Sequence, residues 1–207
     1  MKTFFLNVWR IGRWVLLAIL VIFIALVIYR IPAVGEKERS DQAVAFINAQ
    51  ILSMEDVTGE RLPPTPDPEL ADATIEGIDA NKNGIRDDVE LAIFDMYPGD
   101  KNIKIRAALL QYATGRQMYL TGVFNTDTWI ATVKHESKGI GCMVDVAFEE
   151  YVDIKDQIGK SDEWIEFVND LTFNSDERTN RRNEVSGFET VYVSGDSETC
   201  DVDLKIS

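Results

Sequence analysis

Histidine and cysteine are scarce in this sequence, and their scarcity excludes several kinds of site. The 207 residues contain one histidine, His135, and two cysteines, Cys142 and Cys200. There is no C-x-x-C pair and no histidine at zinc-finger spacing, so a zinc site is not expected. The sequence also lacks the motifs G-x-S-x-G, H-E-x-x-H and the P-loop. It therefore carries none of the usual serine hydrolase, metalloprotease or nucleotide-binding signatures.

Basic residues are also few once the N-terminus is set apart. The first 35 residues hold four basic residues and no acidic one. The remainder carries the other 17 basic residues against all 35 acidic residues. A domain with this negative charge repels phosphate backbones, so we expect no nucleic-acid partner.

The one long hydrophobic run lies near the N-terminus. Residues 14–29, WVLLAILVIFIALVIY, contain no charge and no helix breaker, and arginines flank them on both sides. A run of this kind predicts a membrane-spanning helix, so residues 1–35 are expected to be an uncleaved signal-anchor. A cleaved signal peptide is the alternative, because Ala33-Val34-Gly35 offers the small residues that a signal peptidase reads. The length of the run and the charge of Arg30 favour the anchor.

The rest of the chain has mostly helical periodicity, and we predict a mainly α fold. Residues 36–61 are expected to form an amphipathic juxtamembrane helix with Val44, Ile47 and Ile51 on one face. Residues 62–78 form a proline-rich connection. Residues 79–207 should be a helical domain, and its tail, residues 188–207, alternates weakly and predicts a short strand pair.

Glycines and capping residues set the expected limits of the helices in this domain. The pattern predicts helices over residues 87–97 and 103–120, and a third with Thr126 or Asp127 as its N-cap. Gly139 and Gly141 are expected to break the third helix, and a fourth should then run over residues 142–158. Two more helices are predicted after Ser161 and after Asn174 as N-terminal caps.

Residues 79–90, DANKNGIRDDVE, match the calcium-loop pattern D-x-[DN]-x-[DN]-G-x5-E at every position. Alternate side-chain oxygens can converge on one ion, Gly84 permits a sharp turn, and the side chain of Ile85 should point into the core while its carbonyl faces the ion. The expected ligands are Asp79, Asn81, Asn83, Ile85, Asp87 and Glu90. Three carboxylates and two amides suggest an affinity of roughly micromolar to millimolar.

This loop resembles an EF-hand loop, but the residues before it do not form a long entering helix. The segment TPDPELADATIEG contains proline and glycine where that helix would stand, which leaves one short turn at most. The resemblance is therefore closer to the single loop-plus-helix units of dockerin-like and thrombospondin-type-3-like motifs. It covers about 20 residues and implies bound Ca²⁺ as a cofactor. A static structural ion is favoured over a sensor, because sensors work through paired hands. An acidic helix-capping turn is the alternative.

Cys142 and Cys200 form an even pair, which predicts one disulfide in an oxidising compartment. Two separate buried thiols are the alternative. The loop, the disulfide and the anchor together predict a single-pass membrane protein whose domain is extracytoplasmic, periplasmic or extracellular. Basic residues lie on both sides of the run, so their distribution does not decide which end of the run faces the cytoplasm. The loop and the disulfide are the features that place the domain outside.

No residue pattern identifies a catalytic site. His135 lies seven residues before Cys142, but no catalytic signature surrounds either. Acidic pairs are expected on solvated faces, and Trp129 and Trp164 are expected in the core. The cluster Arg178, Arg181 and Arg182 should pair with the acidic surface in preference to lipid headgroups.

Two functions follow as hypotheses, and the first is preferred. The protein is a membrane-anchored calcium-binding interaction or scaffold module that contacts the membrane through residues 14–29 and binds another envelope protein. Alternatively it is an envelope hydrolase that uses calcium structurally, with His135 and Cys142 or an acidic pair in a deep pocket. A third hypothesis, a lectin or cell-wall binding module, requires an exposed shelf of aromatic side chains near the ion.

Overall fold

A computed structural model describes residues 2–192 and 200–204, and excludes the side chains of residues 2–8, 10, 11, 28 and 31–33. The chain divides into two compact units, residues 1–42 and residues 43–207. The regular structure described in both units is helical, which confirms a mainly α fold.

The first unit consists of the greater part of α1, Lys2–Ala49. Its described apolar side chains between Trp14 and Val27 are exposed. Among the residues described, no helix combines the length and the hydropathy that a membrane crossing requires. The expected membrane segment, residues 14–29, includes Ile28, whose side chain lies outside the described part. The membrane anchor stays a prediction.

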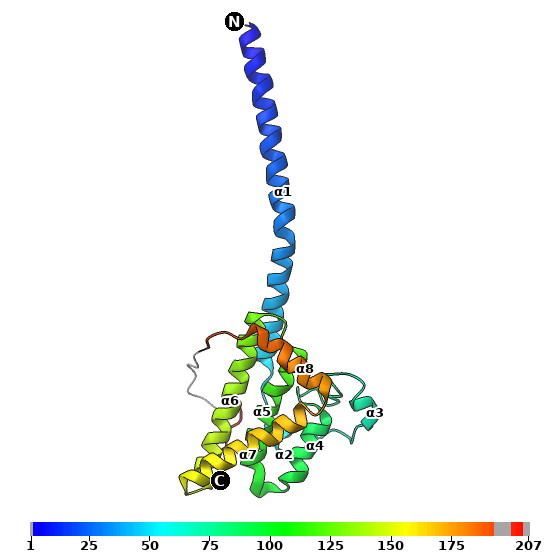
Figure 1. Cartoon of the computed structure of the whole chain (residues 1–207), viewed down its shortest axis with the longest axis vertical. Helices are drawn as coiled ribbons and strands as arrows, with labels where there is room; N and C mark the ends of the chain where they lie inside the picture. Colours follow the sequence, from blue (N-terminus) through cyan, green and yellow to red (C-terminus); the bar gives the residue numbers. More distant parts are fainter. Residues whose placement is uncertain (1, 193–199, 205–207) are drawn as a thin grey trace. The chain divides into compact units, whose positions relative to one another are not determined.

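The second unit contains the end of α1 and the other helices (Figure 1). Four short helices or turns accompany five longer helices in its described part. The longer ones are α4 (Asp87–Met96), α5 (Ile103–Thr121), α6 (Thr126–Glu150), α7 (Ile154–Thr172) and α8 (Asp176–Val185). The short ones are α2 (Met54–Thr58), α3 (Pro68–Ala71) and the 3-10 turn η1 (Asp100–Asn102), and a second 3-10 turn, η2 (Ser186–Phe188), follows α8.

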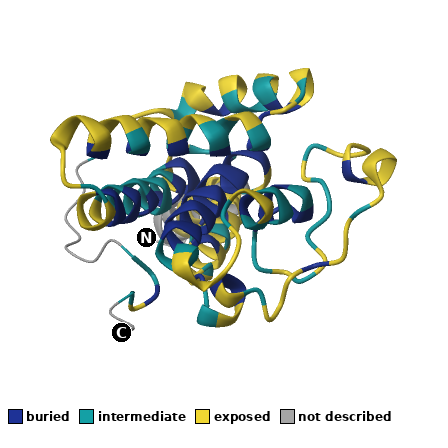
Figure 2. Ribbon diagram, turned by 90° about the horizontal axis from the view of Figure 1, so that it is seen from below, coloured by how far each residue is buried: buried dark blue, intermediate teal, exposed yellow. Residues whose placement is uncertain are grey.

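Helix α5 forms the centre of this unit. Every residue from Ile105 to Leu120 is buried, and the helix contacts α2, α4, α6, α7 and α8. Figure 1 shows α5 between α6 and α4, and Figure 2 shows the buried residues gathered on the central helices. A helix that is surrounded on all sides needs no polar face, and the predicted limits of this helix, residues 103–120, are confirmed.

Helix α6 runs unbroken through Gly139 and Gly141, so the predicted break between a third and a fourth helix is wrong. The cause is the close packing of α6 on α5. A Cβ atom added at Gly139 would lie 2.7 Å from the Cα of Tyr112, and one added at Gly115 would lie 2.9 Å from the backbone nitrogen of Glu136. These glycines bring two helix backbones together and do not end a helix.

Substitution of Gly139 should show this packing directly. We expect Gly139→Ala to lower the free energy of unfolding by about 1–3 kcal/mol, because a backbone has to move to admit the methyl group. The matched control is Gly159→Ala in α7, where an added Cβ meets nothing within 4 Å. There the better helix propensity of alanine should stabilise by about 0.5–1 kcal/mol. Chemical denaturation of both variants measures the difference, and equal effects would contradict the packing role.

Other limits differ from the expected ones for local reasons. Helix α1 ends at Ala49, so Ile47 is buried whereas Ile51 lies beyond the helix and is 65% exposed. A separate helix, α2, then begins at Met54, with Ser53 as its N-cap in a capping box. Ser161 is an interior residue of α7, where its hydroxyl donates to a carbonyl of the same helix. The cap of α8 is Ser175, one residue after the predicted cap.

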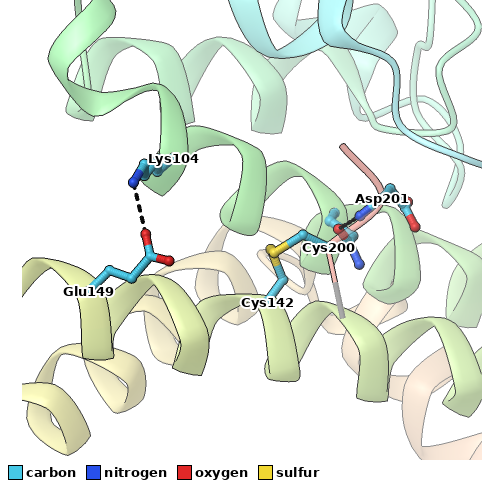
Figure 3. Close-up of a disulfide and its surroundings, with 6 residues drawn as sticks. Lys104, Cys142, Glu149, Cys200 and Asp201 are labelled. Atoms are coloured by element: carbon cyan, nitrogen blue, oxygen red, sulfur yellow. Dashed lines mark hydrogen bonds and ion pairs between the residues drawn. A yellow bond between two sulfur atoms is a disulfide. The ribbon is translucent and has the colours of Figure 1, made fainter. Parts of the chain in front are cut away.

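The disulfide between Cys142 and Cys200 is present and joins α6 to the C-terminal segment (Figure 3). The backbone nitrogen of Asp201 donates to Oε1 of Gln111 at 2.8 Å, and Val202 packs in the core. The predicted strand pair does not form in the described residues of the tail, 188–192 and 200–204. Its remaining residues, 193–199 and 205–207, lie outside the described part.

Candidate calcium-binding loop

Residues Asp79–Glu90 connect the segment after α3 to the first turn of α4. The backbone reverses through two left-handed residues, Lys82 with φ of 59° and Gly84 with φ of 84°. The loop closes where the backbone nitrogen of Asp87 donates to the carbonyl of Ile78 at 2.8 Å. Glycine was predicted at the sharp turn, and the positive φ confirms that requirement.

The carboxylates at loop positions 1 and 9 organise the backbone between them. Asp79 accepts hydrogen bonds from the backbone nitrogens of Asn83 at 3.2 Å and Gly84 at 3.0 Å. Asp87 accepts one from the backbone nitrogen of Ala80 at 2.9 Å. Burial raises the pKa of Asp87, the bond from Ala80 opposes that rise, and the charge of Asp79 adds to it. The two carboxylates therefore face the same interior of the loop.

Glu90, at position 12, is the most unusual group of the loop because it is fully buried. Its Oε2 accepts a hydrogen bond from the amide of Asn81 at 2.9 Å, but its Oε1 has no partner. Nδ2 of Asn83 is also buried without a partner. Burial raises the pKa of Glu90 to about 7; the side-chain amides of Asn81 and Asn83 oppose that rise, and the charges of Asp56 and Asp87 add to it. A buried carboxylate with an unpaired oxygen is costly unless a cation compensates it.

These groups suit a hard, oxygen-seeking cation. In the described part of the chain, no three His, Cys, Asp or Glu side chains gather closely enough to form a metal site by themselves. The donor set depends also on amide and carbonyl oxygens, which calcium accepts readily. The residues that would supply oxygens are those of the predicted pattern: Asp79, Asn81, Asn83, the carbonyl of Ile85, Asp87 and Glu90.

The helices on either side of the loop differ greatly in length. The exiting helix α4 packs Val89 and Ile93 in the core together with Ile85, as predicted, whereas Met96 is 57% exposed and does not belong to the core. On the entering side, α3 is a single turn of four residues. The expected absence of a long entering helix is confirmed.

Arg61 ties the loop to the residues that follow α2, a contact that the sequence did not predict. Its Nη2 donates to the carbonyl of Asn81 at 2.9 Å, and the amide of Asn81 donates back to the carbonyl of Arg61 at 2.9 Å. Its Nη1 lies 3.7 Å from Oδ1 of Asp56. Loop position 3 is therefore held by a reciprocal pair of hydrogen bonds.

Arg86, inside the loop, is fully buried. Its guanidinium donates to the carbonyls of Leu171 at 2.7 Å and Thr172 at 3.2 Å, at the end of α7, and also bonds to Asp88. Its aliphatic carbons cross Gly77, where a side chain would collide with them. A planar group with five donors can bind several carbonyls at once, so Arg86 fixes the loop to a helix 85 residues further along the chain.

Arg178 holds the segment that enters the loop. It is 1% exposed, pairs with the exposed acid Asp72 as predicted for this cluster, and makes five side-chain hydrogen bonds between 2.7 and 3.1 Å. The acceptors are the carbonyls of Ala71, Thr74 and Ile75 and the side chains of Asp72 and Asn174. Its neighbour Arg181 also pairs with an exposed acid, Glu184, at 2.9 Å.

The catalytic candidates do not assemble. The disulfide occupies Cys142, which dismisses a thiol nucleophile beside His135. Burial lowers the pKa of His135. The next residue, Glu136, already accepts bonds from Arg116 at 2.5 Å and from the hydroxyl of Tyr119 at 2.6 Å. Both candidate tryptophans are core residues, as expected: Trp129 is 7% exposed and Trp164 is 1% exposed.

The fold defines the protein coarsely, as a mainly α-helical domain closed by one disulfide. No family model, curated protein or solved structure matches the chain. Its function has to follow from its own residues.

Proposed function

We propose that residues 79–90 bind one calcium ion and that the ion stabilises an interaction or scaffold domain. The proposal rests on one observation above all: Glu90 is fully buried, and one of its carboxylate oxygens has no partner. A divalent ion at this position would compensate the buried charge and occupy the free oxygen. The loop pattern supplies the other donors. The resemblance to dockerin-like and thrombospondin-type-3-like motifs belongs to the same proposal.

The ion acts as a structural clamp in this proposal and not as a sensor. Arg61, Arg86 and Arg178 fix the loop and its entering segment to α2, α7 and α8. A sensor hand opens by swinging an entering helix against an exiting one, and α3 is too short to act as that lever. Calcium would therefore add rigidity to a junction that the arginines already define.

The proposed location is extracytoplasmic, with residues 14–29 as the membrane anchor and another envelope protein as partner. The disulfide supports an oxidising compartment, since disulfides persist outside the cytosol. An acidic surface and a calcium loop suit the same location. The alternative is an envelope hydrolase. Such an enzyme could not use Cys142 as its nucleophile, because this cysteine is bonded to Cys200.

Calcium titration followed by thermal melting tests this function on the full chain in mild detergent. At a calcium concentration of about 100 times Kd the ion should stabilise by about 2.7 kcal/mol, which raises the melting temperature by about 5–10 °C for a chain of this size. Glu90→Gln should remove most of that rise. It should not unfold the protein without calcium, because it replaces a buried charge with a neutral amide.

The matched control is Asp95→Asn, an exposed acid on the same helix as Glu90 but outside the loop. This variant should keep the full response to calcium. An unchanged melting temperature of the unmodified chain in millimolar calcium would refute the proposal.

A further inference from the structure

Asp56, on the short helix α2, is a buried carboxylate that the calcium-loop pattern does not include. It is 3% exposed. Its Oδ2 accepts hydrogen bonds from the backbone nitrogen and the hydroxyl of Ser53, at 3.0 and 2.6 Å. In the described part of the chain, its Oδ1 accepts no hydrogen bond. Nη1 of Arg61 lies 3.7 Å from this oxygen, but the side chain of Arg61 is 47% exposed. A distant and solvated partner compensates a buried charge poorly.

Helix α2 ends against α4, the helix that carries Glu90. A Cβ added at Gly59, directly after α2, would lie 2.8 Å from Cε1 of Phe94 in α4. Arg106 stacks over the same ring at 4.8 Å and donates to a carbonyl of α2 at 3.1 Å. Asp56 stands three residues before Gly59, and Glu90 stands four residues before Phe94. Both carboxylates therefore lie roughly one helical turn from the same contact.

A series of contacts also connects Asp56 to Glu90 through the loop. Beyond its contact with Asp56, Arg61 donates from Nη2 to the carbonyl of Asn81, and the amide of Asn81 donates to Oε2 of Glu90, both at 2.9 Å. Burial is the main cause of the raised pKa of Glu90, and the charge of Asp56 adds to it. The two carboxylates are thus near enough to repel each other, and each has one buried oxygen without a hydrogen bond.

Asp88 shows how the fold compensates another acid near Glu90. The fully buried guanidinium of Arg86 bonds to both of its carboxylate oxygens. The cation beside Asp56 is instead the half-exposed Arg61. A cation bound in the loop would reverse the effect of Asp56. In the empty loop its charge repels Glu90, whereas in the loaded loop it attracts the ion that Glu90 holds.

We propose that Asp56 determines the affinity and the charge selectivity of the calcium site from outside the loop. Its buried charge destabilises the empty loop and stabilises the loaded one, so it favours an ion of high charge. Asp56 acts through its charge and is not counted among the ligands. This inference rests on the proposed calcium site and adds a residue to it that the loop pattern does not contain.

Asp56→Asn tests the inference, because asparagine keeps an oxygen for the two bonds from Ser53 and loses only the charge. Isothermal titration of the full chain in mild detergent measures the affinity for Ca²⁺, and urea denaturation in chelator measures the stability of the empty protein. We expect calcium to bind about tenfold more weakly. Stability in chelator should equal or exceed that of the unmodified chain. A loss of stability in chelator would overturn the inference, because it would assign Asp56 a purely structural role.

Terbium, a trivalent ion close to calcium in size, provides a second readout. Coulomb energy is proportional to the charge of the ion, so the loss of binding free energy should be about one and a half times larger for Tb³⁺ than for Ca²⁺. A tenfold loss for calcium then corresponds to a loss of roughly thirtyfold for terbium. Equal losses for the two ions would overturn the charge selectivity, because a distorted loop weakens both ions alike.

The matched control is Glu55→Gln, which removes an exposed charge from the neighbouring position of α2. This variant should bind both ions as the unmodified chain does. If Asp56→Asn binds calcium as tightly as the control, the inference is overturned and the calcium site still stands. If the unmodified chain binds neither ion, the calcium site is refuted and the inference with it.

Discussion

Replacement of Arg178 by methionine is expected to lower the free energy of unfolding by about 3–5 kcal/mol. Methionine keeps much of the buried volume, so the loss reports hydrogen bonds and not a cavity. The change removes all five bonds of the guanidinium and strands the carbonyls of Ala71, Thr74 and Ile75 next to it. A polar group left buried without a partner costs about 1–3 kcal/mol. Urea denaturation of the full chain in detergent measures the effect.

The control is Arg182→Met, four residues further along α8. The guanidinium of Arg182 stacks over Phe173 at 5.0 Å from the ring centre, a contact worth about 0.5–1 kcal/mol at a partly exposed site. We also expect Arg178→Met to weaken the response to calcium, because the segment from Ala71 to Ile75 enters the loop. Equal losses in the two variants would show that Arg178 does not hold that segment in place.

The turn of the candidate calcium loop and the two helices after it could be predicted because their signals are local. Gly84 is required by a single positive φ, Asp87 and Asp88 stand at the start of α4, and α5 follows from apolar residues at helical spacing, Ala107, Leu110 and Ala113, with Gly122 just beyond its end. Each signal lies within a few residues of the feature that it specifies. The structure reproduces all three.

The arginines around the loop could not be predicted because their partners are distant in sequence. Arg178 bonds to carbonyls 103 to 107 residues before it, and Arg86 to carbonyls 85 and 86 residues after it. A carbonyl is present at every position, so the sequence holds no mark of which one accepts. An arginine in an acidic chain is expected on the surface until the fold shows it buried.

Gly139 illustrates the same difficulty for helix limits. A glycine within a helical pattern indicates either a break or a close approach of another backbone. The two cases differ only in whether another helix packs against the glycine. Here the backbone of Tyr112 in α5 lies against Gly139, so the glycine permits close packing and does not end the helix. The position of the exposed Phe46 could not be predicted for the same reason. Its place beside the loop depends on how the end of α1 packs against α5.

Removal of the disulfide should have an effect as large as that of Arg178. We expect the double variant Cys142→Ala with Cys200→Ala to lose about 4 kcal/mol, because the bond closes a separation of 58 residues in the unfolded chain. Native contacts at the tail depend on the same bond. Asp201 receives a hydrogen bond from the backbone nitrogen of Leu52 at 3.2 Å and donates one to Gln111, so the tail also secures the segment between α1 and α2.

Reductant provides the control for this prediction. Urea denaturation of the full chain in dithiothreitol should give the stability of the double variant, and the reductant should leave the double variant unchanged, because the chain has no other cysteine. The calcium response should survive, since Cys142 lies on α6 and none of the expected ligands does. A loss below about 1 kcal/mol would contradict the prediction, because it would mean that the unfolded chain is scarcely restricted by the closed loop.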